Sequence, residues 1–256
     1  MSAVKLHYEV SGPDELPALV LEGSLGTTLA MWAPQVAALS QHFRLVRVDH
    51  RGHGGSPVPV GPYSIEDLGA DLLTLLDALA IERAGFVGLS IGGMVGMQVA
   101  ASAPARVERL ALLCTSAYAP PASAWHERAE AVLAAGSPEI VADTIVGRWF
   151  TAPWIASHPA IVSEYRAMIA GTDPAGYAGC CEAIGGMDLR SVLTSITAPT
   201  LVISGDDDPS LPPEHQQLIA ATIPDARLET LADAAHLPNV QHPELVNELL
   251  LEHFCA

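Results

Sequence analysis

In Gly85-Phe86-Val87-Gly88-Leu89-Ser90-Ile91-Gly92-Gly93, an apolar run breaks into the pattern Gly-x-Ser-x-Gly, and a segment of helical character follows it. A sharp strand-to-helix turn holds a serine hydroxyl clear of a sheet, and it leaves no room for a Cβ two residues before or after the serine. Gly88 and Gly92 satisfy that condition. The turn also points the first N–H groups of the helix at the place where a carbonyl oxygen would gain negative charge. The stretch therefore predicts a nucleophile elbow with Ser90 as the nucleophile.

The pattern around the elbow is that of a mostly parallel sheet covered by helices on both faces. Short runs rich in Val, Ile and Leu alternate with longer segments of helical period. We expect strands at residues 5–10, 18–21, 43–48, 84–89, 109–114, 200–204 and 227–231. Helices should fill the gaps, and a last helix starting near Pro243 should close the domain. The sequence thus predicts the α/β class.

One helix is expected to begin after Ser64, which is placed to cap it, with acids in its first turn. An apolar stripe follows and should face the sheet. Its members are Leu68, Leu72, Leu75, Leu76 and Leu79. Asp71 and Asp77 are then expected to face solvent.

Between Cys114 and Thr200 the alternation is lost, and helical patterns follow one another at residues 125–135, 138–150, 159–170 and 174–184. This arrangement predicts a helical cap, residues 118–190, inserted into a core domain formed by residues 1–117 and 191–256. The cap holds three of the four tryptophans: Trp125, Trp149 and Trp154. Clustered aromatic side chains either pack a core or line a substrate site, and both interpretations stay open for them.

The net charge of -17, with one lysine and eleven arginines, repels nucleic acid and anionic lipid surfaces. An anionic substrate would need a local arginine, because the long-range field opposes its approach. The first residues show no apolar segment of a secretion signal, and no apolar run reaches membrane-spanning length. The four cysteines lack zinc-ligand spacing and are expected to be reduced. These features predict a cytoplasmic protein without a metal site, and they leave the oligomeric state open.

A serine nucleophile needs a base and a carboxylate that orients the base, in the order Ser, Asp or Glu, His along such a chain. The expected strand at residues 200–204 is followed by Asp206, Asp207 and Asp208, so an acid lies at the carboxyl edge of the sheet. The three adjacent acids leave its register undecided. His236 follows the last strand and could return an imidazole to the same edge. The order predicts a triad of Ser90, one of these acids and His236.

The oxyanion hole should combine the N–H of Ile91 with one N–H from the loop at residues 22–26. Ser24 is the first choice there, and Leu25 is the alternative. The glycine-rich stretch at residues 49–56 also follows a strand and carries paired charges. We expect it to be a structural turn rather than catalytic.

Several motifs resemble the α/β-hydrolase superfamily over the whole chain, and within it the 3-oxoadipate enol-lactonases. They are Ser24-Leu25-Gly26-Thr27-Thr28, Gly61-Pro62-Tyr63-Ser64-Ile65, the elbow, Arg148-Trp149-Phe150-Thr151 and residues 176–184, Gly-Tyr-Ala-Gly-Cys-Cys-Glu-Ala-Ile. The resemblance implies an α/β-hydrolase fold, Asp208 as the triad acid, and no cofactor. It also implies a small carboxylated enol-lactone as substrate, opened through an acyl-enzyme to 3-oxoadipate. One departure is Glu22-Gly23, which stands where this family is expected to carry Ser-Asn.

Other functions remain compatible with the same fold and triad. A broad carboxylesterase or a cofactor-free perhydrolase is the nearest alternative, and a carbon-carbon bond hydrolase is a weaker one. A small-molecule receptor that binds without turnover is an alternative from a different class.

Arg148 is the predicted ligand of the substrate carboxylate. It follows Val141 and Ile145 along one line of the expected helix at residues 138–150, and it adjoins Trp149, which is expected to help line the site. The alternative is an arginine that stabilises a helix C-terminus and extends into solvent.

Overall fold

The computed structural model describes residues 2–256 and contains a seven-stranded sheet. The strands are β1 (Tyr8–Ser11), β2 (Ala18–Glu22), β3 (Arg44–Val48), β4 (Ala84–Leu89), β5 (Val107–Leu113), β6 (Thr200–Gly205) and β7 (Ala226–Leu231). Their order across the sheet is β1-β3-β2-β4-β5-β6-β7. Only β1 runs antiparallel to its neighbour. The carboxyl ends of β2 to β7 therefore meet at one edge, where side chains from distant parts of the sequence can converge.

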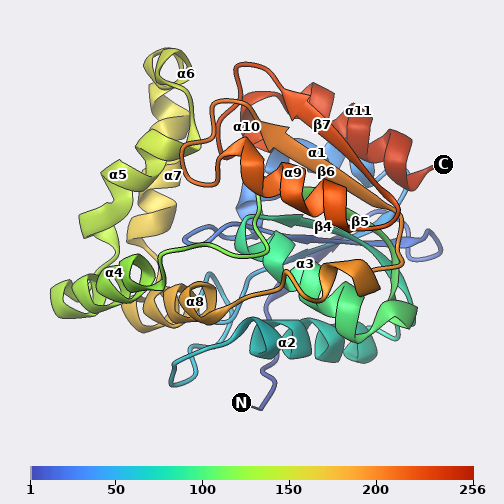
Figure 1. The fold of residues 1–256 in the computed structure, drawn as a ribbon, viewed down its shortest axis with the longest axis horizontal. Helices are drawn as coiled ribbons and strands as arrows, with labels where there is room; N and C mark the ends of the chain where they lie inside the picture. Colours follow the sequence, from blue (N-terminus) through green and yellow to red (C-terminus); the bar gives the residue numbers. More distant parts are fainter. Residues whose placement is uncertain (1) are drawn as a thin grey trace.

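Helices cover both faces of this sheet. Around the sheet lie α1 (Ala33–Leu39), α2 (Ile65–Ala78), α3 (Ile91–Ser102), α9 (Pro213–Thr222), α10 (Pro238–Gln241) and α11 (Pro243–Phe254). Short 3-10 helices lie at Leu29–Trp32, Pro104–Arg106 and Leu193–Ser195. In Figure 1, α2 and α3 lie below the sheet, and α1 and α11 lie above it. The predicted α/β-hydrolase architecture is confirmed.

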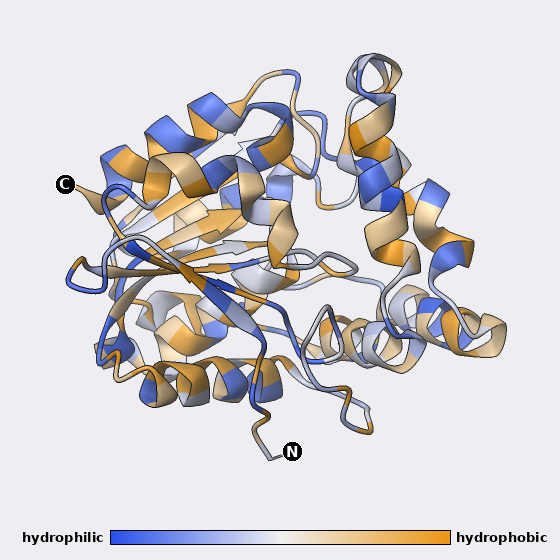
Figure 2. Ribbon diagram, turned by 180° about the vertical axis from the view of Figure 1, so that it is seen from behind, coloured by the Kyte–Doolittle hydropathy of each residue, from blue (hydrophilic) through white to orange (hydrophobic). Residues whose placement is uncertain are grey.

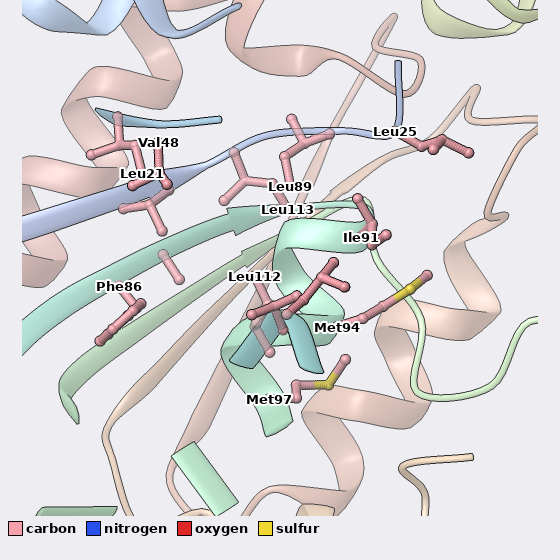
Figure 3. Close-up of a cluster of buried hydrophobic side chains, with 14 of the residues drawn as sticks. Leu21, Leu25, Val48, Phe86, Leu89, Ile91, Met94, Met97, Leu112 and Leu113 are labelled. Carbon is pink, nitrogen blue, oxygen red and sulfur yellow. The ribbon is translucent and has the colours of Figure 1, made fainter. Parts of the chain in front are cut away.

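The core forms where the central strands meet α3. All six residues of β4 are buried, as expected for a strand covered on both faces. Figure 3 shows Ile91, Met94 and Met97 of α3 beside Leu112 and Leu113 of β5. The central strands are largely hydrophobic, whereas the covering helices alternate between hydrophobic and hydrophilic residues (Figure 2). The elbow is thus anchored between a fully buried strand and a largely buried helix.

Helix α2 begins with the predicted cap, because the Ser64 side chain accepts from the Asp67 N–H while the Asp67 carboxylate accepts from the Ser64 N–H. The prediction that Asp71 faces solvent is wrong. Asp71 is 1% exposed and forms an ion pair with Arg51, with Nε–Oδ2 at 2.5 Å and Nη2–Oδ1 at 2.7 Å. A buried carboxylate needs such a partner, and Arg51 supplies it from the loop that follows β3.

Five helices lie between β5 and β6 and stand beside one end of the sheet (Figure 1). They are α4 (Ala122–Ala135), α5 (Glu139–Trp149), α6 (Ala152–Ser157), α7 (Pro159–Ala170) and α8 (Pro174–Gly186). We call this group the cap. Its position places several helices over the carboxyl edge of the strands. No helix within residues 2–256 combines the length and the apolar character that a membrane crossing requires.

Candidate active site

Ser90 sits at the turn between β4 and α3, with φ +56° and ψ -117°. A non-glycine residue rarely adopts such a conformation, and the turn holds it only because its surroundings are tightly packed. A Cβ on Gly88 would collide with the Gly92 carbonyl, and a Cβ on Gly92 would collide with the Glu22 carbonyl. The Thr115 hydroxyl adds a 2.6 Å hydrogen bond to the Ser90 carbonyl. The geometry is that of the predicted elbow.

His236 and Asp208 are both 3% exposed, and they are joined by a 2.8 Å hydrogen bond between Nδ1 and Oδ2. The carboxylate accepts a hydrogen bond from Nδ1–H, which leaves Nε2 of the imidazole free to act as a base. The other carboxylate oxygen of Asp208 accepts from the N–H groups of Ser210 and Leu211 at 2.8 and 3.2 Å. These bonds hold the carboxylate in place.

Among the three adjacent acids, Asp206 and Asp207 are exposed, and only Asp208 is buried against His236. Sequence order alone left this register open. The geometry favours Asp208 as the acid of the triad.

The loop that carries His236 is fixed by the end of α5 and by α10. The Leu237 N–H donates to the Trp149 carbonyl at 3.0 Å. The Ala235 N–H donates to Gln241 Oε1 at 2.8 Å. The cap is thereby tied to the residue next to His236, and a change in the cap can move the imidazole.

Cys114 lies next to Asp208. Burial, followed by the nearby Asp208 carboxylate, raises the pKa of its thiol well above the usual value. The thiol therefore stays protonated and is not a competing nucleophile.

Ser90 and His236 line the same small cavity between the sheet edge and the cap. Its lining is completed by Ser24, Leu25, Trp125, Arg128, Ile145, Trp149, Tyr177, Ile184, Ser210 and Leu211. Within residues 2–256 the serine hydroxyl and the imidazole form no direct hydrogen bond. Such bonds often tighten only when substrate binds, so their common cavity is the informative observation.

The expected oxyanion donors lie at this cavity. Ser24 and Leu25 line it, and Ile91 is the first residue of α3. The N–H groups of Leu25 and Ile91 have no hydrogen-bond partner within residues 2–256. Ser24 and Leu25 both stay candidates for the second donor.

Arg148 does not line the cavity, and its side chain is exposed. The prediction that it faces the sheet domain is wrong. The buried residues of α5 are Ala142, Ile145, Val146 and Trp149. At 100° per residue, Arg148 lies roughly 110° from the middle of that stripe. Trp149, its neighbour in sequence, does line the cavity.

The cavity instead contains Arg128 of α4, whose guanidinium carbon lies 4.7 Å from the centre of the Trp125 ring. No carboxylate in residues 2–256 lies within ion-pair distance of Arg128. Tyr177 is 1% exposed, and its hydroxyl lies beside the Arg128 guanidinium, which acts on it through its charge and as a hydrogen-bond donor. Burial raises the pKa of Tyr177, so the hydroxyl stays protonated. A cation without a carboxylate partner in the described residues and a protonated phenol beside it therefore share one cavity.

Sequence reasoning missed Arg128 and Tyr177, and it left the role of Trp125 open. A signal was present, because Trp125 and Arg128 are three residues apart on a helix and lie on one face of it. Of the cap tryptophans, Trp154 packs against Phe150 and His158 at ring distances of 4.4 and 4.2 Å. Each interpretation of the cap tryptophans therefore holds for part of the group: Trp125 and Trp149 line the cavity, and Trp154 packs within the cap.

No group of three His, Cys, Asp or Glu side chains in residues 2–256 has the arrangement of a metal site. The arrangement at the sheet edge is suited to acyl transfer by a serine with a histidine base.

Residues 17–148 and 149–243 match the protein family described as alpha/beta hydrolase fold. The chain belongs to the α/β-hydrolase family. It is 39% identical over 244 residues to 3-oxoadipate enol-lactonase 2 of Acinetobacter baylyi, which covers 95% of this chain and 91% of that protein. The crystal structure of the enol-lactonase from Burkholderia xenovorans matches it with a TM-score of 0.96 and 42% identity, covering 100% of this chain and 99% of the other.

Another relative carries the name "Putative carbamate hydrolase RutD", from Stutzerimonas stutzeri. It is 34% identical over 258 residues, covering 97% of this chain and 96% of that protein. The resemblance to 3-oxoadipate enol-lactonases is confirmed by the first two similarities.

Proposed function

We propose that the protein is a serine hydrolase that opens a small carboxylated enol-lactone, 3-oxoadipate enol-lactone, to 3-oxoadipate. One observation carries the proposal: the cavity that holds Ser90 and His236 also holds Arg128, a cation without a carboxylate partner in the described residues. The similarity to two enol-lactonases supports the same substrate class.

In the first step, Ser90 Oγ attacks the ring carbonyl and His236 Nε2 takes the hydroxyl proton. Asp208 stabilises the imidazolium through the bond to Nδ1. The N–H of Ile91, together with that of Ser24 or Leu25, stabilises the oxyanion. The ring C–O bond then breaks, and the imidazolium returns its proton to the leaving oxygen, which becomes an enol.

The enol stays tethered to the acyl group and could attack back to close the ring. Ketonisation removes that nucleophile. Water, activated by His236, then attacks the acyl-enzyme and releases the product carboxylate and Ser90. The substrate's own carboxylate would bind Arg128, with Tyr177 as a second donor.

The decisive experiment follows the loss of ultraviolet absorbance of the enol-lactone with purified protein. Hydrolysis that is abolished in Ser90→Ala supports the proposal. Rapid Ser90-dependent hydrolysis of p-nitrophenyl acetate without lactone turnover would instead indicate a broad carboxylesterase. Turnover of neither substrate, nor of any other activated ester, would indicate a receptor.

A carbamate is the second candidate substrate, because of the similarity to the RutD relative. It presents the same kind of carbonyl to Ser90. Amine release from a carbamate that exceeds lactone turnover in kcat/KM would favour this candidate over the lactone.

A further inference from the structure

A buried pair of side chains lies beneath the expected oxyanion loop. Glu22 ends β2, and His50 follows β3, the neighbouring strand in the sheet. His50 Nδ1 lies 2.7 Å from Glu22 Oε1, and His50 Nε2 lies 2.8 Å from the carbonyl oxygen of Gly23. Both side chains are almost inaccessible, with 2% of each residue exposed. The histidine thus connects a carboxylate to the backbone of the loop.

The chemistry of the partners sets the direction of these bonds. A carbonyl oxygen only accepts, so Nε2 of His50 carries a proton and donates to Gly23. A second proton lies between Nδ1 and the Glu22 carboxyl group. Burial raises the pKa of Glu22. Burial opposes the charge on His50, but the Glu22 carboxylate and the bonds to Glu22 and Gly23 outweigh it and raise the pKa of His50.

Other ionisable groups face this pair from the elements around it. They are Asp49, Asp71 and His53, with Arg51 already paired to Asp71. None of them forms a hydrogen bond to Glu22 or His50 within residues 2–256. The proton between Glu22 and His50 therefore belongs to the hydrogen bond between these two side chains and is not shared with the neighbouring groups.

The far end of the loop is held by a second histidine. The Gly26 N–H donates to His53 Nε2 at 2.9 Å, and His53 Nδ1 lies 3.3 Å from the Arg51 carbonyl. His53 thus accepts with one nitrogen and donates with the other, which requires a neutral ring. Burial, assisted by the charge on His50, lowers the pKa of His53 to about 3. The turn at residues 49–56 thus contacts the oxyanion loop at both ends.

Gly23 also connects the loop to the nucleophile. Its carbonyl oxygen accepts from the Gly92 N–H at 3.1 Å, and Gly92 lies in the first turn of α3, two residues after Ser90. We propose that Glu22 and His50 are positioning residues that hold the backbone of residues 23–26 through the Gly23 carbonyl, so that the loop N–H stays aimed at the oxyanion. The proposal rests on acyl transfer by Ser90, and it does not depend on the identity of the lactone.

The test compares the double variant E22L/H50L with E22Q. Replacing a buried ion pair by apolar side chains of similar volume often preserves stability, so we expect the double variant to fold. It removes the donor to the Gly23 carbonyl. In E22Q, the new amide N–H can donate to His50 Nδ1 while Nε2 still donates to Gly23, so every bond is preserved.

Activity is measured with p-nitrophenyl acetate, and the affinity for phenylboronic acid, which forms a tetrahedral adduct with an active serine, is measured in parallel. Misplacing an oxyanion donor should lower kcat of E22L/H50L roughly 10- to 100-fold, since full removal costs about 10²–10³. KM should change less than about twofold, because the donor acts in the transition state. The boronate inhibition constant should rise by the same factor as kcat falls. For E22Q, both kcat and the boronate inhibition constant should stay within about threefold of the wild-type values.

The matched control is V246A, a truncation of a buried core residue on α11, a helix outside both the loop at residues 23–26 and the elbow. It should lower the melting temperature and leave kcat and boronate affinity unchanged. A folded double variant with wild-type kcat and boronate affinity would overturn the proposal, and so would an E22Q that loses as much as the double variant. If E22L/H50L does not fold, E22Q/H50L removes the same donor to the Gly23 carbonyl without leaving an unpaired buried carboxylate, and it is compared with E22Q in the same way. Failure of lactone turnover alone would refute the proposed substrate and leave this test intact, because ester and boronate report on Ser90 directly.

Discussion

Replacing Arg128 with methionine should separate carboxylated from neutral substrates. The change removes the guanidinium and keeps a flexible apolar side chain against Trp125. In the structure Arg128 is the cation that lines the cavity with Ser90, and no carboxylate in the described residues neutralises it. A substrate carboxylate would be its partner.

The size of the effect follows from the environment of the guanidinium. A hydrogen bond to a charged group contributes about 1.5–3 kcal/mol. Arg128 is partly exposed, so solvent screening favours the lower part of that range, about 1.5–2 kcal/mol. This free energy corresponds to roughly a 10- to 30-fold loss in kcat/KM for the carboxylated lactone. Most of the loss should fall on KM, because the carboxylate is bound in both the ground state and the transition state.

The assay compares Arg128→Met with Arg148→Met on the enol-lactone and on phenyl acetate. Both variants remove one positive charge from the cap, but Arg148 lies outside the cavity and should change either rate by less than about twofold. Arg128→Lys should recover part of the affinity, since an ammonium supplies the charge without the bidentate geometry. Equal losses on both substrates for Arg128→Met would refute a carboxylate-binding role and would mean that Arg128 holds the cap together.

Three further outcomes are expected. Ser90→Ala and His236→Ala should each abolish nearly all esterase activity, and the double variant should lose little more than either alone, because the residues act as one unit; multiplicative losses would contradict this. Asp208→Asn should lower kcat far more than Asp206→Asn, since only the former removes the bond to the imidazole; the reverse order would refute the register. Because the pKa of Glu22 in the folded protein lies above the ordinary value of 4.5, the folded state retains a proton that the unfolded state loses. Its contribution to the free energy of unfolding is fully present below pH 4.5 and is lost as the pH rises through the folded pKa, so urea denaturation of Glu22→Gln should show a smaller decline over that range. If the free energy of unfolding of Glu22→Gln declines as much as that of the wild type, a group other than Glu22 titrates over this range.

The fold could be predicted because its signals are local. Seven apolar runs gave seven strands, and the elbow needed only two glycines around a serine. Strand ends were less accurate where long-range contacts decide them. Residues 5–7 were expected in the first strand, but the ladder stops at Tyr8 because His7 bonds instead to Ser56 and Asp49 beyond the end of β3. The fifth strand was expected to end at Cys114. It ends at Leu113, one residue earlier, because Cys114 has a φ of +43° and leaves the extended conformation.

The errors in the candidate site have a common cause. Asp71 and Arg148 are charged residues on helices, and periodicity places them only relative to their own helix. Which side of α2 meets Arg51, and which side of α5 meets the sheet, depends on contacts between segments far apart in the sequence. Arg128 was missed for the same reason, because α4 enters the cavity only once the cap has folded over the sheet. Order along the chain predicted that Ser90 and His236 lie at one sheet edge, and both line the same cavity, whereas the position of the cap residues depended on packing.

The nucleophile and the oxyanion loop are linked through a single carbonyl group. The Gly23 carbonyl accepts from the Gly92 N–H of α3 on one side and from His50 Nε2 of the buried Glu22–His50 pair on the other. Gly92 is also packed so closely against the carbonyl of Glu22 that no side chain fits between them. A shift of β2 relative to α3 would therefore move Ser90 and the loop N–H away from each other. Acyl transfer requires these groups to stay within a few tenths of an ångström of their working positions. In the proposed role, Glu22 and His50 thus form a rigid support beneath the expected oxyanion loop, and Glu22-Gly23 stands where the enol-lactonase family is expected to carry Ser-Asn.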